Sequence, residues 1–479
     1  MKIYDSRLKQ KIDFVPIKEK KVRIYVCGPT VYDDAHLGHA RSAIVFDILR
    51  RVFVLSGYEV IFVKNFTDID DKIIKKSIQT KIPIQELTQH YMASYLHDMA
   101  SLKVKEPDIA PEATKSIAEI TTLIQKLIDK GFAYTFENGD IYLNVQKDDK
   151  YGSISGRGID DENIARIQND EHKKDSRDFV LWKAYKGADD IGYESALGKG
   201  RPGWHIECSA MIEEYLAYKD TEFSIDIHAG GADLLFPHHE NEASQTRCAT
   251  DREIAKYWMH NGFVNINGEK MSKSLGNSFF IKDALKAYSG EILRNYLLGV
   301  HYRAILHFNE QDLIASKKRL DKIYRLKKRV GKSTESKAES NTESHAKSYA
   351  DESFKNAMLE AMSDDLNISK ALSILEEMLN SANAKLDSAP KDKQLKNQII
   401  DNIKFVEELL GIGGGDEVLY FQHGVSDEQK QYIQNLINKR LEAKKNKDFA
   451  LADSIREELY TQGIALSDTI DGCIWEKVE

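Results

Sequence analysis

The chain of 479 residues contains only four cysteines, too few for a disulfide-rich secreted scaffold. No run approaches the roughly 18 apolar residues that cross a membrane, and Met1–Gln10 lack the apolar segment of a signal peptide. The formal net charge of −8 argues against a protein that coats nucleic acid through bulk positive charge. These absences predict a cytoplasmic protein with reduced thiols, and the length predicts about three domains.

Near the N-terminus the pattern predicts a strand, a helix and a second strand. Residues Val22–Val26 alternate apolar side chains and are rich in β-branched types, which is typical of a strand. The segment Gly38–Leu55 has apolar residues at helical spacing, and Val60–Val63 reads as the next strand. Two strands joined by a helix form a parallel unit, so the sequence predicts an α/β fold class with a parallel sheet.

A second junction of strand and helix lies far along the chain. Phe223–Ile227 predicts a strand, His228–Gly231 a Gly-rich turn, and Leu234–Ala249 a helix. The intervening residues have Gly- and Asp-rich turns of different character. We therefore predict a first domain over residues 1–305, split by an insertion at about residues 110–205.

Helical patterns dominate after Gly290. They predict a helical domain over residues 306–410 and a C-terminal domain over residues 420–479, joined by a Gly-rich linker at Gly411–Gly415. Residues 331–353 are rich in Ser, Glu and Lys and predict a flexible loop. No repeat and no heptad pattern is evident, so we expect a monomer.

His36 and His39 flank Gly38 where the first predicted strand passes into its helix. A helix N-terminus there presents free backbone N–H groups to a phosphate, and Gly38 lets a ligand approach closely. The pattern indicates a nucleotide site. A pair of histidines that only caps the helix is the alternative.

Lys270 and Lys273 lie three residues apart on a segment rich in Ser and Gly. Such lysines can neutralise the negative charge that develops as pyrophosphate leaves a triphosphate. By itself the segment is equally typical of a polar surface loop.

Cys27, Cys208, His238 and Glu242 together make a full set of zinc ligands. His238 and Glu242, four residues apart, share a helix face, but the wide spacing of the others does not pair them. The alternative is two buried cysteines that behave as small apolar residues, beside a surface histidine and glutamate.

These motifs, with their neighbours, resemble the signatures of the cysteinyl-tRNA synthetase family among class I aminoacyl-tRNA synthetases. The likeness covers Tyr25–Tyr32, Gly200–Met211, Phe236–Glu242, the lysine segment, Lys447–Asp453 and Asp468–Trp475, in the expected order. It implies a Rossmann-like catalytic domain with an insertion, followed by a helical bundle and a small anticodon-binding domain.

The resemblance also implies roles for individual residues. Zinc would be held by Cys27, Cys208, His238 and Glu242, and ATP with Mg²⁺ by the segment Pro29–His39, which includes Thr30, His36, Gly38 and His39, and by Lys270 and Lys273. Catalysis would rest on His36, His39, Lys270 and Lys273. The amino-acid pocket would be lined by Trp204, His228 and Thr30. Cys248 and Cys473 match no ligand position.

By resemblance the enzyme activates cysteine with ATP and esterifies it to tRNA(Cys), and zinc selects the substrate thiolate. Contacts with the tRNA anticodon are expected from Arg440, Lys444, Lys445 and Trp475, since basic and aromatic side chains bind single-stranded RNA. Trp475 is equally compatible with a core tryptophan. Two basic clusters, Lys317–Lys332 and Lys439–Lys447, are equally compatible with solvated helix faces.

Three other functions fit parts of the pattern. A cysteine ligase acting on a small amine would share the zinc and ATP motifs but lack the residues from Val425 to Glu479. A catalytically silent RNA-binding protein would not need the histidine and lysine motifs. A nucleotidyltransferase would explain those two motifs but not the zinc ligands.

Overall fold

The structure is a computed structural model that describes residues 1–157, 173–187, 190–266, 269–270, 279–331, 350–469 and 472–477. The chain forms two compact units. Unit 1 comprises Met1–Lys282, Leu297–Asn309 and Ala357–Leu372, and unit 2 comprises Asp283–Tyr296, Glu310–Asn356 and Ser373–Glu479. Among the helices in these described ranges, none has the length and apolar character needed to cross a membrane.

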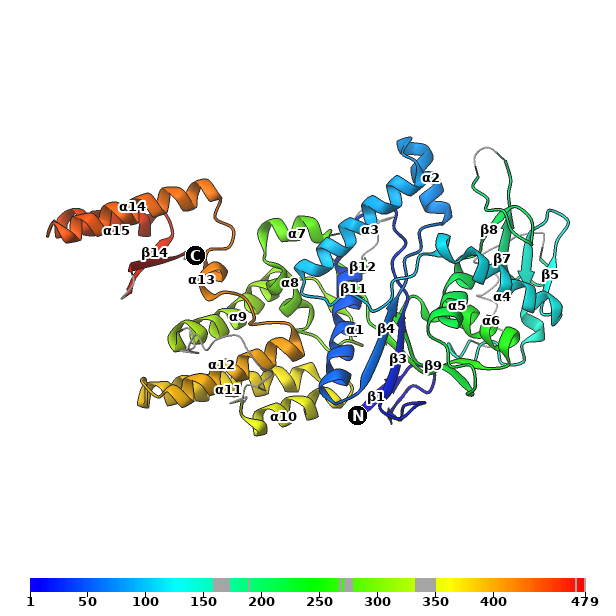
Figure 1. Cartoon of the computed structure of the whole chain (residues 1–479), viewed down its shortest axis with the longest axis horizontal. Helices are drawn as coiled ribbons and strands as arrows, with labels where there is room; N and C mark the ends of the chain where they lie inside the picture. The colour runs from blue at the N-terminus through cyan, green and yellow to red at the C-terminus, as the bar shows by residue number, and fades with distance from the viewer. Residues whose placement is uncertain are drawn as a thin grey trace, which may run out of the picture. The chain divides into compact units, whose positions relative to one another are not determined.

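The centre of unit 1 is a parallel sheet of four strands. Its order is β10 (Glu253–Asn261), β9 (Phe223–Gly231), β3 (Lys21–Val26) and β4 (Glu59–Lys64). Helix α1 (Leu37–Leu55) connects β3 to β4, as Figure 1 shows, which confirms the predicted strand, helix and strand. Apolar side chains of β3 are fully buried, so this sheet is core on both faces.

Strand β9 extends four residues further than predicted. Residues His228–Gly231, predicted as a turn, pair with Trp258–Asn261 of β10, and His228 also pairs with Tyr25 of β3. Neighbouring strands on both sides satisfy the backbone of this Gly-rich segment, which local composition does not reveal. The predicted turn is therefore wrong.

After β4 the chain forms further helices and an antiparallel sheet, and this sheet lies within the range predicted for the insertion, about residues 110–205. Helices α2 (Asp71–Thr80), α3 (Ile84–Ser101) and α4 (Ile117–Asp129) lead into strands β5 (Ala133–Thr135), β6 (Ile141–Leu143), β7 (Phe179–Ala184) and β8 (Gly200–Pro202), with short helices at Ala113–Ser116 and Val145–Lys147. Helix α5 (Trp204–Tyr215) returns the chain to β9. The short helix η3 (Leu235–His239) and α6 (Glu240–Thr250) then connect β9 to β10.

Two small sheets complete unit 1. Strands β1 (Lys2–Asp5) and β2 (Gln10–Asp13) form a hairpin. Strand β11 (Val264–Ile266) pairs with β12 (Glu269–Lys270) and, in parallel, with β13 (Leu306–His307).

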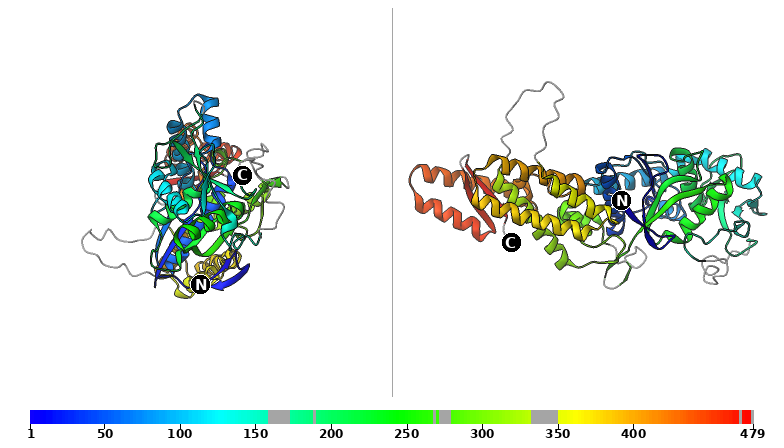
Figure 2. Two further views of the ribbon diagram at one scale, coloured as in Figure 1. Left: turned by 90° about the vertical axis from the view of Figure 1, so that its right-hand side faces the viewer. Right: turned by 90° about the horizontal axis from the view of Figure 1, so that it is seen from below.

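The remaining helices follow in chain order and make up most of unit 2 (Figure 2). They are α7 (Ile281–Ala287), α8 (Gly290–Leu297), α9 (Glu310–Val330), α10 (Glu352–Ser363), α11 (Ile368–Ser388), α12 (Lys393–Leu410), α13 (Glu417–Phe421), α14 (Asp427–Lys445) and α15 (Phe449–Thr461). Residues 352–353 of the predicted flexible loop are helical, and residues 332–349 lie outside the described residues.

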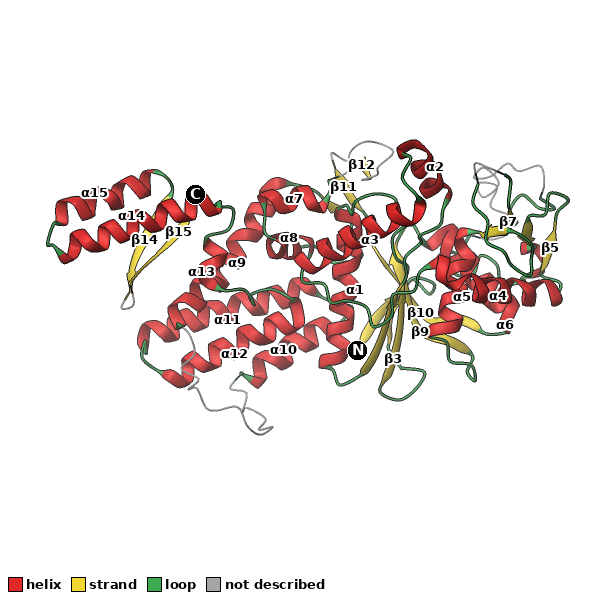
Figure 3. Ribbon diagram, turned by 45° about the horizontal axis from the view of Figure 1, so that its top comes forward, coloured by secondary structure: helices red, strands yellow, loops and turns green. Residues whose placement is uncertain are grey.

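Two sequence expectations for unit 2 change. The Gly411–Gly415 segment is not a free linker, because Lys327 Nζ donates to the carbonyl oxygens of Gly413 (2.9 Å) and Gly415 (2.6 Å). The chain also ends in a hairpin of β14 (Ile464–Thr469) and β15 (Gly472–Lys477), which helix periodicity did not predict. Figure 3 shows this hairpin beside α14 and α15. The domain boundaries predicted at residues 305 and 410 stay predictions.

Candidate functional site

A cavity of about 430 Å³ opens where the parallel strands of unit 1 end. Cys27 follows β3, Gly231 ends β9, and Asn261 ends β10, and all three line it. The chain leaves β3 toward one edge of the sheet and β9 toward the other, and ligands of open parallel sheets bind at such a division. The cavity is further lined by Gly28, Pro29, Thr30, Tyr32, His36, Gly38, His39, Ser42, Lys64, Lys72, Tyr95, Trp204, Asp233, Leu234, Gly262, Phe263 and Val264.

The histidine motif caps the helix that faces this cavity. His36 Nδ1 accepts hydrogen bonds from the backbone N–H groups of Gly38 (3.1 Å) and His39 (3.4 Å). In return the backbone N–H of His36 donates to His39 Nδ1 (3.2 Å), and the two rings stack with centroids 3.8 Å apart. Capping and ligand binding are thus compatible, because the same residues begin α1 and line the cavity.

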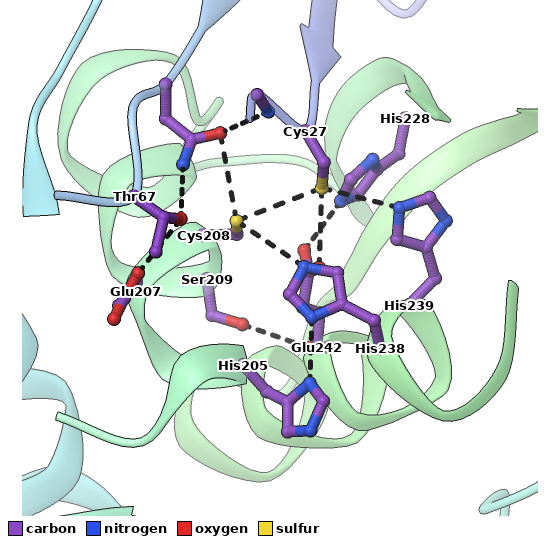
Figure 4. Close-up of polar contacts among 12 residues, drawn as sticks. Cys27, Thr67, His205, Glu207, Cys208, Ser209, His228, His238, His239 and Glu242 are labelled. Atoms are coloured by element: carbon purple, nitrogen blue, oxygen red, sulfur yellow. Dashed lines mark hydrogen bonds and ion pairs between the residues drawn. The ribbon is translucent and has the colours of Figure 1, made fainter. Parts of the chain in front are cut away.

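Cys27, Cys208, His238 and Glu242 meet at one buried point (Figure 4), although Cys27 directly follows β3 and the others lie in α5, η3 and α6. The two sulfurs are 3.8 Å apart, Cys208 Sγ lies 3.7 Å from His238 Nε2, and Cys27 Sγ lies 3.6 Å from Glu242 Oε1. A tetrahedral zinc with Zn–S bonds of ~2.3 Å would hold two sulfurs about 3.8 Å apart. His238 Nε2 and Glu242 Oε1 are 2.8 Å apart, and this distance would increase slightly around the metal ion. The donor set therefore fits zinc.

Further histidines surround this cluster, which sequence reasoning did not assign. His205 and His238 share a contact between their Nδ1 atoms at 2.8 Å, and His239 Nδ1 lies 2.8 Å from His260 Nε2. His239 Nε2 also approaches Cys27 Sγ to 3.4 Å. A second group of possible donors, Cys27, His228, His239 and Glu242, consequently overlaps the first. The adjacency of His239 to His238 was the signal that could have found it.

Charges in the cluster favour a divalent cation. Hydrogen bonding from Cys27, against the effect of burial, lowers the pKa of the Cys208 thiol to about 6. Burial acts to raise the pKa of Glu242, but His238 and His228 together lower it to about 2. Burial opposes the charge of His238, whereas Glu242 and Cys208 raise the pKa of that imidazole to about 10. Bound zinc would take the place of the protons on Cys27 and His238.

Trp204 and His228, both predicted to line the amino-acid pocket, occupy different places. Trp204 is 39% exposed, lines the cavity and stacks on His238 with ring centroids 4.1 Å apart. His228 is fully buried, and its Nε2 contacts Glu242 Oε2 at 2.7 Å. His228 therefore holds Glu242 in place and is not among the residues that line the cavity.

Thr30 lines the cavity as predicted. Of the two lysines of the lysine segment, only Lys270 is among the described residues. The backbone of Lys270 ends β12, which pairs with β11 beside the cavity. Lys273, predicted as the principal lysine, lies outside the described residues. The roles predicted for both lysines stay predictions.

The C-terminal residues predicted to bind tRNA are mostly engaged within unit 2. Trp475 is 5% exposed and packs in an apolar cluster with Ile433, Ile437 and Leu459, so the geometry favours the core alternative. Arg440 is buried and pairs with Asp468 at 2.7 Å, and Lys444 pairs with the same carboxylate at 2.7 Å. Neither Arg440 nor Trp475 is placed to contact a base.

Exposed aromatic and basic side chains lie elsewhere in this part of unit 2. Phe449, at the start of α15, is 62% exposed, and Lys445 and Lys447 precede it closely in the chain. An exposed ring beside lysines can stack on an unpaired base while the lysines contact phosphate. The neighbouring sequence Lys447–Asp453 was noted for its resemblance, but periodicity alone did not show that its aromatic ring faces solvent.

The fold and the site define the class. Residues 13–318 match the catalytic domain of class I (C) tRNA synthetases, and residues 357–412 match the DALR domain. The cysteine–tRNA ligase of Helicobacter hepaticus is 60% identical over 99% of each chain. That of Wolinella succinogenes is 59% identical over 100% of this chain and 99% of its own. The chain therefore belongs to the cysteine–tRNA ligase family, which confirms the resemblance.

A solved structure agrees with the fold. Methionyl-tRNA synthetase of Mycobacterium tuberculosis, in complex with methionyl-adenylate, is 14% identical with a TM-score of 0.60, covering 82% of this chain and 92% of that chain. The predicted fold class, a parallel-sheet catalytic domain followed by a helical region, is thereby confirmed.

Proposed function

We propose that the chain activates cysteine with ATP and transfers it to the 3′-terminal ribose of tRNA(Cys). The carrying observation is that Cys27 belongs both to the buried donor cluster and to the wall of the cavity that the histidine motif faces. A thiol held at the cluster therefore lies in the same cavity as a phosphate held at α1. Family membership supports the same reaction.

Selection of cysteine rests on the cluster of Cys27, Cys208, His238 and Glu242. Differences of one atom in a shaped pocket supply only about 1–3 kcal/mol, too little to separate cysteine from serine faithfully. Zinc, when bound, is a soft Lewis acid that prefers a thiolate and lowers the pKa of a thiol far more readily than that of a hydroxyl. No separate editing site is then required.

The protein groups around the cluster keep its donors in place. Glu242 is fully buried and is contacted by both His228 and His238, which fix the two carboxylate oxygens. Burial lowers the pKa of His205 well below its usual range, so its neutral ring meets that of His238 without adding charge. Trp204 stacks on His238 at the cavity wall and limits the access of water.

The nucleotide would bind at the other side of the cavity. The rings of His36 and His39, at the positive end of the α1 dipole, would hold its phosphates, with Mg²⁺ accompanying the ATP. A cysteine carboxylate oxygen then forms a bond to the α-phosphorus, and the bond to the bridging oxygen breaks to release pyrophosphate. Lys270 and Lys273 would neutralise the developing charge.

A ribose hydroxyl of the tRNA next attacks the carbonyl carbon of the adenylate, and AMP leaves. In the C-terminal part of unit 2, we expect Phe449 and Lys445, rather than the buried Arg440 and Trp475, to contact the anticodon loop. Lys444 forms an ion pair with Asp468 and would exchange it for an ion pair with a phosphate of the tRNA. We further propose that the enzyme acts in the cytoplasm, where its substrate tRNA and reduced thiols occur.

The test is transfer of labelled cysteine to total tRNA, with serine as competitor, before and after removal of zinc by a chelator. We expect charging that depends on zinc and that excess serine does not displace. Release of pyrophosphate without charging would favour a ligase acting on a small amine. Absence of cysteine activation by folded, zinc-loaded protein would refute the proposal and leave an RNA-binding protein. Unchanged selectivity after complete zinc removal would refute the role of the cluster.

A further inference from the structure

Arg41 is a fully buried arginine in α1, two residues beyond His39. Its guanidinium group reaches out of the helix toward two separate chain segments. Nη1 donates to the carbonyl oxygens of Gly262 (3.2 Å) and Phe263 (2.6 Å). A second, distant segment supplies the other acceptors, because Nη2 donates to His301 (3.1 Å), Tyr302 (3.4 Å) and Ala304 (2.5 Å).

The first of these segments is part of the cavity wall. Gly262, Phe263 and Val264 line the cavity, as do His36 and His39 of the histidine motif. Helix α1 and strand β11 lie side by side in both Figure 1 and Figure 3. Arg41 thus connects the helix that carries the histidine motif to the cavity-lining segment that leads into β11.

The two segments contacted by Arg41 are also joined to each other. The backbone N–H of Gly262 donates to Tyr302 O (2.8 Å), and that of Leu306 donates to Phe263 O (2.9 Å). A Cβ atom on Gly262 would stand 2.4 Å from Ala304 O, so the two backbones touch without space for a side chain. The two segments are therefore directly joined, and a shift of one is expected to move the other.

The same wall leads to the first lysine of the lysine segment. Strand β11 pairs with β12, and Asn265 is the register partner of Lys270. The backbone position of Lys270 relative to His36 and His39 is therefore set by how β11 is held against α1. Arg41 is suited to this task, because its planar fork offers several donors at once in fixed directions, whereas a lysine offers one point charge.

We infer that Arg41 is a positioning residue for adenylate formation: it fixes the β11–β13 wall against α1 and so sets the geometry of the ATP phosphates. The inference rests on the proposed function. Arg41 itself does not line the cavity, and we assign it no contact with substrate.

The test compares Arg41→Lys with a matched control, Arg294→Lys. Arg294 is likewise fully buried and donates from Nε to a backbone carbonyl, that of Leu410 (2.6 Å), but it lies in unit 2. Cysteine-dependent exchange of pyrophosphate into ATP is measured for each, together with bound zinc and the thermal midpoint. For Arg41→Lys we expect kcat to fall about 10- to 100-fold and the KM for ATP to rise, as for a misplacement of roughly 1 Å.

A purely structural arginine would behave differently. Arg294→Lys should lower the thermal midpoint while its KM for ATP stays at the wild-type value. Arg41→Lys should retain full zinc content and a KM for cysteine within about twofold of wild type, since the cluster lies on other elements. If folded Arg41→Lys keeps the wild-type kcat and KM for ATP, or loses affinity for both substrates equally, the inference is overturned.

Gly262→Ala gives a second route if Arg41→Lys does not fold. The added methyl group would push the same wall apart while Arg41 remains, and the same selective loss for ATP is expected. Calorimetric titration with a non-hydrolysable ATP analogue distinguishes a failure of the proposed function from a failure of the role assigned to Arg41. Wild-type protein that binds the analogue but does not activate cysteine would refute the proposed function alone. An affinity unchanged in both variants would refute the role of Arg41 alone.

Discussion

Asp365 offers a sharp test of how unit 1 is held together. This fully buried carboxylate accepts from the backbone N–H of Tyr4 (2.9 Å) and the hydroxyl of Tyr302 (2.7 Å) at Oδ1. Its Oδ2 accepts from Nε (3.0 Å) and Nη2 (2.7 Å) of Arg303. It thereby ties the first strand and the segment of residues 301–303 to the turn between α10 and α11.

The expected cost of Asp365→Asn follows from these four contacts. The asparagine amide has one oxygen, which can accept hydrogen bonds either from Arg303 or from Tyr4 and Tyr302. Its NH₂ group would then face the remaining donors. Hydrogen bonds to a charged group contribute about 1.5–3 kcal/mol each, and Arg303, whose side chain is 34% exposed, can recover part of the loss from water. We expect unfolding to become easier by about 2–3 kcal/mol. The left-handed backbone at residue 365 (φ 58°) does not add to this, since Asn tolerates it.

The assay is equilibrium urea unfolding followed by tryptophan fluorescence, to which Trp182, Trp204 and Trp258 of unit 1 contribute. Asp364→Asn is the matched control. That side chain is 48% exposed, and its ion pair with Lys11 should contribute less than about 1 kcal/mol. If the two variants unfold at the same urea concentration, Asp365 does not hold these segments together and the reasoning is wrong.

Three further predictions concern stability, metal and RNA. Burial and the charge of Asp34 raise the pKa of Asp98 to about 6, so ionisation weakens the fold and stability should fall as pH rises from about 4 to about 6; thermal midpoints of Asp98→Asn should lack this fall, and an equal fall would contradict the prediction. Cys208→Ser should lower zinc affinity more than about 100-fold in a competition titration, whereas Cys248→Ser, outside the cluster, should retain it. Phe449→Ala should raise the KM for tRNA by about five- to 100-fold, as the loss of a stacked base contact implies, and leave pyrophosphate exchange unchanged; equal losses in both assays would refute a role limited to tRNA.

Local pattern was sufficient where the interactions are local. The strand, helix and strand from Val22 to Val63 were predicted because alternate and helical spacings differ along a short segment. The four-residue spacing of His238 and Glu242 predicted a shared face of one helix; the two residues instead lie in the consecutive helices η3 and α6, and their side chains still meet. Both results depend on residues close together in the chain.

Long-range pairing decided what local pattern could not. The Gly-rich end of β9 looks like a turn until β3 and β10 are placed beside it. Trp475 and Arg440 look like RNA-binding residues until the C-terminal hairpin closes over α14 and α15 and buries them. In each case the deciding partners lie on another strand or helix.

The sequence by itself determined the class of chemistry only through the resemblance of several long motifs to a known family, because each set of candidate donors, taken alone, also fitted a structural role. Only the tertiary structure decided which of those donors meet. Cys27 and Cys208 are 181 residues apart, and they come within 3.8 Å because β3 and β9 pair in parallel while α5 and α6 pack beside them. The same packing carries Arg41 to the carbonyl groups of residues 262–304. Spacing along the chain does not predict such contacts, because they depend on the register of strands and on the burial of whole helices.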